Sequence, residues 1–220
     1  GRALEQWPQK LQKALPGFPD LLSFDMGGTT AKLCAIEGGQ PFKVHEFEVD
    51  RIYRFKRGSG LPIKIPVIDM IEIGAGGGSI AHVDSLGLLK VGPESAGADP
   101  GPACYGKGNQ EPTVTDADLV LGYLDPNYFL GGEMLLDQEK AKQVINDCLA
   151  KPFKMSITRA AYGIHEVVNE NMASAARMHA TEHNADPVST RDRSGHPRGS
   201  ASRYRVIAGS PRYRPPASIC

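Results

Sequence analysis

The sequence predicts an α/β protein in which strands come first, helices come last and a glycine- and proline-rich segment lies between them. Residues 21–50 carry short apolar runs and, in part, the two-residue alternation of half-buried strands. Glycine, proline and small residues crowd residues 91–106. Residues 113–183 carry helical signals, including apolar side chains at the spacing of amphipathic helices.

A three-stranded meander is predicted for residues 21–50. The apolar runs "LLSF" and "AKLCAI" are joined by "DMGGTT" at residues 25–30, which would form the first turn. In the next turn, "EGGQP", Gly38 and Gly39 tolerate the positive φ of a tight hairpin. The alternating stretch "HEFEVD" supplies the third strand.

Two less regular segments follow the meander. The basic, glycine-rich stretch "RIYRFKRGSGLP" at residues 51–62 predicts a mobile loop, and "IPVIDMIEI" predicts a strand or a buried segment. The stretch "VGPESAGADPGPACYG", residues 91–106, is irregular and long. Such a segment inside a compact domain is usually either functional or disordered.

Three helices are predicted after residue 113. Thr115 is a possible N-cap, with Asp118 three positions later as a variant of the capping box. Residues 137–150, "DQEKAKQVINDCLA", form an amphipathic helix, and a longer helix begins after a cap at Ser156. The apolar stripe of that longer helix contains Ile157, Ala161, Ile164, Val168, Ala175 and Met178.

The composition excludes several classes of partner. The 25 Lys and Arg residues balance 25 Asp and Glu residues, so net charge gives no reason to expect nucleic acid or an anionic membrane. No apolar run approaches the roughly 20 residues of a transmembrane helix. Four widely spaced cysteines without a C-x-x-C pair are typical of reduced thiols, and we expect a cytoplasmic protein.

The composition changes near residue 187. Residues 188–220 hold seven arginines, no lysine, no Leu or Phe and a single acid, so they carry +6 and residues 1–187 carry −6. One interpretation is a basic disordered tail. The other is a frameshifted stretch that does not belong to the natural protein. We therefore separate a domain at residues 1–187 from an arginine-rich segment at residues 188–220.

The stretch "DMGGTT" has two interpretations. As a phosphate site, the backbone N–H groups of Gly27 and Gly28 would approach an anion, the hydroxyls of Thr29 and Thr30 would add donors, and Asp25 would hold Mg²⁺. As a plain hairpin, the same glycines would only form a turn. The second run, "GAGGGS", lacks the G-x-G-x-x-G context of a dinucleotide site, and no Walker A loop is present.

The stretch "HATEH" also has two interpretations. His179 and His183 lie one helical turn apart and match the H-x-x-E-H pattern of some zinc enzymes. That pattern needs a further carboxylate ligand on a downstream helix. The alternative is two exposed histidines at the end of a helix. Tyr162, His165 and Asn169 are expected at a helix surface or at the edge of the core.

Three stretches together resemble the hydantoinase A/oxoprolinase family. They are "SFDMGGTTAKLCAIEGG", "IEIGAGGGSIAHVDSLGLLKVGPESAGADPGPACYGKG" and "PTVTDADLVLGYLDPNYFLGG", and the resemblance covers most of residues 15–187. It implies the actin-like ATPase fold, in which two ribonuclease H-like halves close over a nucleotide. Residues 25–30 would then be the phosphate loop that opens the second half.

The resemblance also implies a set of nucleotide contacts. ATP and Mg²⁺ are the expected cofactors. Asp25 would be the catalytic residue and the metal ligand. The Gly27 and Gly28 amides and the Thr29 and Thr30 hydroxyls would contact the phosphates. We add the second glycine run to the cofactor-binding set: Gly76, Gly77 and Gly78.

The function implied by the resemblance is ATP-dependent opening of a cyclic amide of the hydantoin, N-methylhydantoin or 5-oxoproline type. A partner subunit of the hydantoinase B type is implied as well. One alternative is a segment of the ATP-handling subunit of an acetone-type carboxylase. Another is a non-catalytic, truncated segment that serves at most as an assembly surface.

The sequence departs from the family pattern in three places. Many relatives have an acid at the position of Lys32, whereas one hydantoinase-like branch shares "TTAK" with this chain. The family's first half, with its first phosphate loop, is expected before Gly1. The "GGAGP" loop that would hold adenosine is replaced near the C-terminus, although "RYRVIA" matches the strand before it.

Overall fold

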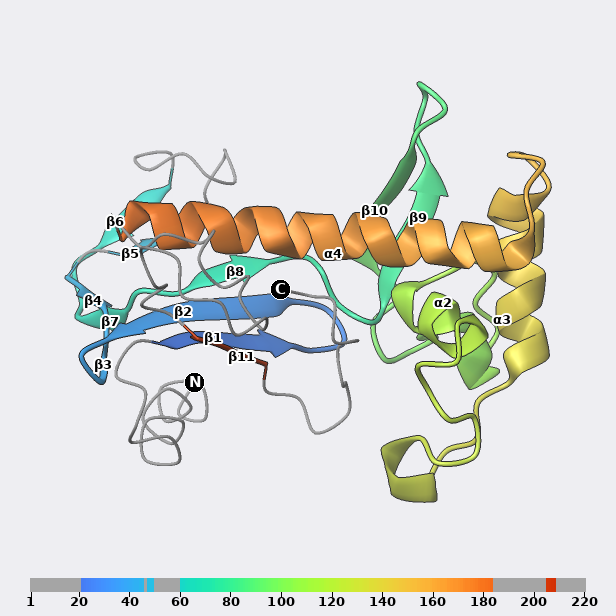
Figure 1. Ribbon diagram of the computed structural model, residues 1–220, viewed down its shortest axis with the longest axis horizontal. Coiled ribbons are helices and arrows are strands. Elements are labelled where there is room, and N and C mark those ends of the chain that lie inside the picture. Colours follow the sequence, from blue (N-terminus) through green and yellow to red (C-terminus); the bar gives the residue numbers. More distant parts are fainter. Residues whose placement is uncertain (1–20, 46, 50–59, 184–204, 209–220) are drawn as a thin grey trace, which may run out of the picture. The chain divides into compact units, whose positions relative to one another are not determined.

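The computed structural model describes residues 21–45, 47–49, 60–183 and 205–208 (Figure 1). The predictions for most of the basic loop and for most of the arginine-rich segment lie outside these ranges. The chain divides into two compact units. Unit 1 consists of Gly1–Phe24, Leu33–Ile71 and Met178–Ile207, and unit 2 consists of Asp25–Lys32, Glu72–Arg177 and Ala208–Cys220.

The largest sheet has five strands in the order β11-β1-β2-β3, and β8 pairs with β2. Gly38 and Gly39 adopt φ values of 56° and 79° in the tight turn between β2 and β3, which confirms the predicted hairpin. Both faces of β2 are covered, since four consecutive residues are buried. The strands are β1 (Leu21–Met26), β2 (Ala31–Glu37), β3 (Gln40–Pro41), β8 (Ile71–Ile73) and β11 (Arg205–Ala208).

One prediction about strands needs correction. The stretch around residues 45–50 does not form the third strand of the meander, because β4 (Lys43–Val44) pairs with β7 (Val67–Ile68) and β5 (Phe47–Val49) pairs with β6 (Leu61–Ile63). An alternating pattern identifies a strand without identifying its partner. Within the arginine-rich segment, β11 forms an edge strand beside β1, in the stretch "RYRVIA" that the resemblance identified as a strand.

Unit 2 contains a hairpin and a group of short helices. The antiparallel hairpin is formed by β9 (Ser79–Val83) and β10 (Leu89–Ser95), with an irregular register between Val91 and Ser95. The segment at residues 91–106 is therefore ordered: β10 takes up its first part and a 3₁₀ turn takes up its end. The helical elements are η1 (Ala103–Tyr105), α2 (Val114–Val120), η2 (Leu130–Gly132), α3 (Gln138–Ile145) and η3 (Asn146–Ala150).

A small apolar cluster holds these helices together. The buried side chains come from η1, α2, the segment before α3, and α3 itself, and α2 lies beside α3 (Figure 1). Asp137 caps α3 by accepting a hydrogen bond from Lys140 N–H, and η3 continues the helix to residue 150 as a π-helical turn, so the predicted helix is confirmed. The buried members are Cys104, Leu119, Leu136 and Ala141.

The long helix α4 spans Ile157–Glu182, and Ser156 Oγ accepts a hydrogen bond from Arg159 N–H at its start, as predicted. The predicted stripe is largely correct, with Ala161, Ile164, Val168 and Ala175 buried. Its last member is wrong, because Met178 is 37% exposed whereas His179 is 2% exposed. In the part of the chain that the structure describes, no helix is long and apolar enough to cross a membrane.

Candidate functional site

The turn between β1 and β2 presents glycine backbone to solvent. Gly27 N–H donates to the carbonyl oxygen of Thr30 at 2.9 Å and closes the turn, while Gly27, Gly28 and Thr29 are exposed. A Cβ added at Gly28 would meet no atom within 4 Å. Asp25 is half-buried near the end of β1. The turn therefore has open space above it, which a bound anion could occupy.

The second glycine run packs against this turn. Gly77 N–H donates to Gly27 O at 3.1 Å and Gly78 N–H donates to Gly28 O at 2.6 Å. A Cβ at Gly76 would lie 2.7 Å from the carbonyl group of Gly28 and from Thr29 N, which no real Cβ tolerates. Only glycine fits at position 76. This packing gives the second glycine run a structural role as a support of the first.

Helix α2 anchors the second glycine run in turn. The N–H and the hydroxyl of Thr115 both donate to Gly77 O, each at 2.8 Å. A Cβ at Gly77 would lie 2.7 Å from Thr115 Oγ1, so glycine is required here too. The first turn, the second glycine run and the N-terminal turn of α2 thus form one hydrogen-bonded stack inside unit 2.

The predicted cap of α2 is wrong by two residues. Thr113 is the N-cap and forms a capping box with Asp116, whereas Thr115 lies inside the first turn of the helix. The stretch "TVTD" contains two overlapping registers of the same pattern, and local sequence does not separate them. Asp116 decides between them. Its buried carboxylate completes the capping box with Thr113 and also accepts hydrogen bonds from the segment before the helix.

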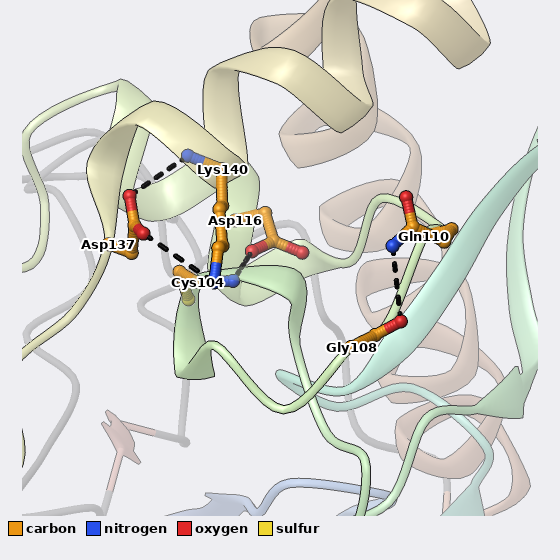
Figure 2. Close-up of polar contacts among 6 residues, drawn as sticks. All are labelled: Cys104, Gly108, Gln110, Asp116, Asp137 and Lys140. Carbon is orange, nitrogen blue, oxygen red and sulfur yellow. Dashed lines mark hydrogen bonds and ion pairs between the residues drawn. The ribbon is translucent and has the colours of Figure 1, made fainter.

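Asp116 connects α2 to the glycine- and proline-rich segment (Figure 2). Its carboxylate accepts hydrogen bonds from Ala103 N–H at 3.2 Å and Cys104 N–H at 2.8 Å, in addition to Thr113 N–H at 2.9 Å and Thr113 Oγ1 at 2.8 Å. The side chain is fully buried. Backbone N–H groups at the end of this irregular segment are therefore satisfied by one carboxylate, which explains how the segment is ordered.

Lys32 is neutralised by an acid from another strand. Its Nζ donates to Thr30 Oγ1 at 2.6 Å and lies 2.8 Å from Glu72 Oε1. Hydrogen bonds from Lys32 and Thr30 lower the pKa of the Glu72 carboxyl. A carboxylate is thus present beside Thr30.

The polar groups around the turn fit a magnesium phosphate. Asp25 and Glu72 are carboxylates, the oxygen ligands that Mg²⁺ prefers. Exposed Gly28 and Thr29 offer backbone to an anion, while the Gly27 amide is engaged within the turn and Thr30 Oγ1 accepts from Lys32. Asp25 could therefore hold the metal, and Gly28 and Thr29 could contact phosphate oxygens.

A second buried polar group lies between α2 and α4. Asp118 Oδ1 is 3.0 Å from His165 Nδ1, and both side chains are almost fully buried. The ring of Tyr123 lies 4.9 Å from that of His165. His165 therefore belongs to the core of unit 2 and not to a helix surface, whereas Tyr162 is 51% exposed, as expected. The sequence offered no signal that would pair Asp118 with His165.

Comparison with known proteins decides the family. The model of the hydantoinase/oxoprolinase family matches residues 9–194. The chain belongs to the hydantoinase/oxoprolinase family. This confirms the resemblance inferred from the three quoted stretches.

Two sequence relatives illustrate the range of this hydantoinase/oxoprolinase family. The chain is 44% identical over 171 residues to caprolactamase subunit alpha of Pseudomonas jessenii, covering 78% of the chain and 23% of the relative. It is 36% identical over 167 residues to 5-oxoprolinase of Saccharomyces cerevisiae, covering 71% of the chain and 12% of the relative. The chain therefore spans about a quarter or less of these relatives.

Solved structures agree with the sequence relatives. The ATP-dependent caprolactamase of Pseudomonas jessenii matches with a TM-score of 0.71 at 37% identity, over 91% of the chain and 26% of that structure's chain. Nucleotide-free acetone carboxylase, from work on ATP-dependent acetone carboxylation, also gives a TM-score of 0.71, at 28% identity over 82% of the chain and 24% of its own. The mixed α/β architecture is thus shared by a lactam-opening enzyme and a carboxylase.

Proposed function

We propose that residues 25–30 form a phosphate-binding turn for ATP. The observation that carries this proposal is the exposed backbone at Gly28, held in place by the buried stack of Gly76, Gly78 and Thr115 beneath it. A rigid support with an open upper face is what a preorganised anion site requires. We further propose that the chain is part of one ribonuclease H-like half of an actin-like ATPase, the fold in which such a turn faces a nucleotide.

The proposed reaction is the ATP-dependent opening of a cyclic amide. A lactam or cyclic ureide carbonyl is stabilised by resonance, and transfer of the terminal phosphoryl group of ATP to its oxygen, with ADP leaving, would give an activated imidate-like species. Water would add to its carbon, and the ring C–N bond would break as the nitrogen takes up a proton. Hydrolysis of the resulting acyl phosphate would release the carboxylate and phosphate. In this chain, Asp25 would hold Mg²⁺ and the Gly28 and Thr29 backbone would orient the phosphates. The relatives named caprolactamase and 5-oxoprolinase support this substrate class.

A partner subunit is part of the proposal. Caprolactamase subunit alpha is by name one subunit of a larger enzyme, as are the acetophenone carboxylase gamma subunit and the acetone carboxylase beta subunit. We propose that the protein acts together with a subunit of the hydantoinase B type. The cyclic amide would then be bound with help from residues outside this chain.

A ketone carboxylase is the second candidate. It is favoured by the acetone carboxylase structure, whose TM-score of 0.71 equals that of caprolactamase, and by 48% identity over 116 residues to the acetophenone carboxylase gamma subunit of Aromatoleum aromaticum. In that reaction the same turn would bind ATP, and the phosphoryl group would pass to an enolate. The difference lies in the substrate and not in the turn.

The test measures phosphate release by the protein that carries this chain, purified with any subunit that accompanies it. We expect phosphate release from ATP that depends on 5-oxoproline, a hydantoin or caprolactam and that is lost in Asp25→Asn. Asp84→Asn, which changes a half-buried acid outside the turn, is the matched control and should leave the rate unchanged. Release that requires a ketone and bicarbonate would identify a carboxylase, and no release with any substrate would contradict an enzymatic role.

A further inference from the structure

A cluster of two histidines and one carboxylate lies inside unit 1, apart from the proposed phosphate turn. His179 lies in the last turn of α4, His183 directly follows that helix, and Asp69 comes from the connection between β7 and β8. One ligand atom from each residue lies within 4.8 Å of the others. Among the described residues this is the group whose side chains are of the kind and spacing that hold a metal ion.

The cluster corrects the interpretation of "HATEH" as exposed histidines. His179 is 2% exposed, and the side chains of His183 and Asp69 are 12% and 19% exposed. The missing carboxylate was expected downstream, on a helix after the motif. It comes instead from Asp69, far upstream in the sequence.

Two polar atoms of this cluster, one on Asp69 and one on His183, are poorly satisfied by the described protein groups. Asp69 Oδ2 and His183 Nε2 lie 3.0 Å apart, yet both atoms are shielded from solvent and neither makes a properly directed hydrogen bond within the described part of the chain. A shielded carboxylate oxygen is costly without a compensating positive charge. A cation shared by both atoms would supply that charge.

Neighbouring groups hold the ligands in place. The ring of Phe42 stacks on His183 with centroids 4.1 Å apart and an angle of 16° between the planes, and the His179 ring lies edge-on to His183 at 4.8 Å. Asp69 N–H donates to Phe42 O at 2.8 Å, which fixes the connection that carries the carboxylate. Ligands whose orientation is fixed by their neighbours are a feature of built metal sites.

We propose that Asp69, His179 and His183 bind a divalent transition-metal ion of the zinc class. Two imidazoles and a carboxylate are a ligand set that zinc accepts, with water in the fourth position. Tetrahedral nitrogen and oxygen ligands lie about 3.4 Å apart, and the observed separations of 3.0 Å to 4.8 Å are within reach of side-chain rotation. The ion would fasten the last turn of α4 to the connection between β7 and β8.

The proposed role is structural and not catalytic. In zinc enzymes with the H-x-x-E-H pattern, the glutamate between the histidines acts at the metal. Here Glu182 is exposed and does not belong to the cluster. With three shielded ligands and, among the described residues, no further acid in the cluster, the site is suited to joining two segments.

The test uses the complete 220-residue chain, equilibrated with zinc, desalted and analysed for bound metal. We expect one zinc per chain in the wild type and in the control His45→Gln, which changes an exposed histidine of the same unit outside the cluster. Asp69→Asn and His183→Gln should weaken zinc binding at least about tenfold, the lower end of what even outer-shell partners of a metal contribute. Binding is measured by competition with a chromophoric chelator.

A gain of signal guards against variants that fail to fold. Cobalt(II) bound to His183→Cys should show a thiolate-to-cobalt charge-transfer band that the wild type lacks, because the new ligand is sulfur. The proposal is overturned if the wild-type chain retains no zinc, if the two ligand variants retain as much zinc as His45→Gln, or if cobalt bound to His183→Cys lacks that band.

Discussion

Thr115 donates its backbone N–H and its hydroxyl to the same carbonyl oxygen, that of Gly77, at 2.8 Å each. Gly77 N–H donates to Gly27 O, so one glycine joins the start of α2 to the turn between β1 and β2. The turn at residues 25–30 is therefore supported by a second glycine run and by a helix. A substitution in either support should alter the conformation of the turn.

The first prediction compares two glycines of the stack. Gly76→Ala should destabilise the chain by about 1 to 3 kcal/mol, the usual cost of overpacking, because its Cβ would lie 2.7 Å from the Gly28 backbone. Gly28→Ala should cost less than about 0.5 kcal/mol, since its Cβ meets nothing within 4 Å. Urea unfolding measures both. Equal costs would show that the two runs do not pack as described.

The second prediction concerns the carboxylate that orders the glycine- and proline-rich segment. Asp116→Asn should lower the free energy of unfolding by about 2 to 4 kcal/mol. The new amide would bring donors to a buried position where four hydrogen-bond donors already converge. Asp137→Asn is the matched control at an exposed helix cap (Figure 2). It should cost less than about 0.5 kcal/mol, since Asn caps as well as Asp. Chemical denaturation of both variants separates a buried anchor from an ordinary cap.

The third prediction is a pH dependence. Burial raises the pKa of the Asp118 carboxyl above its ordinary value of 3.8, although a hydrogen bond with His165 acts in the opposite direction. The folded chain then binds a proton that the unfolded chain releases, so this contribution to stability is present below pH 3.8 and is lost as the pH rises.

The measurement compares the unfolding free energy of the wild type with that of Asp118→Asn from about pH 4 to about pH 6. The unfolding free energy of the wild type minus that of Asp118→Asn should become smaller as the pH rises. Asp84 is the control, because hydrogen bonds from Leu88 and Leu86 lower the pKa of its carboxyl. For Asp84→Asn, the difference in unfolding free energy from the wild type must not become smaller over this range. If the difference for Asp118→Asn stays constant with pH, the raised pKa of Asp118 is refuted.

The sequence predicted those features that depend on neighbours along the chain. The two glycine turns and the cap at Ser156 follow from local backbone chemistry, and they are confirmed. The cap of α2 was misplaced because Thr113 and Thr115 offer the same local pattern, and a distant segment decides between them.

Contacts between residues far apart in the sequence escaped prediction. Nothing in the sequence pairs Asp69 with His183 or Glu72 with Lys32, since periodicity carries no information about which segments meet. The packing of the second glycine run escaped prediction for the same reason, and its contact with a cofactor stays a prediction. Its pattern resembles a ligand loop, whereas Gly76 is glycine because another backbone lies against it.

The fourth prediction concerns affinity. The 220-residue chain should bind Mg·ATP weakly, with a dissociation constant on the order of 1 mM. The turn at Gly28 is exposed, so water competes for the phosphate contacts and weakens the electrostatic attraction. Isothermal titration calorimetry measures this constant, and micromolar binding would contradict the argument from exposure.

The most direct test of the phosphate turn is a titration of the isotope-labelled chain with Mg·ATP, followed by the amide resonances in nuclear magnetic resonance spectra. We expect saturable shifts centred on Gly28 and Thr29, smaller in Asp25→Asn and unchanged in the control Asp84→Asn. Saturable shifts elsewhere with none at residues 25–30, or the same shifts in Asp25→Asn as in the wild type, would contradict this expectation.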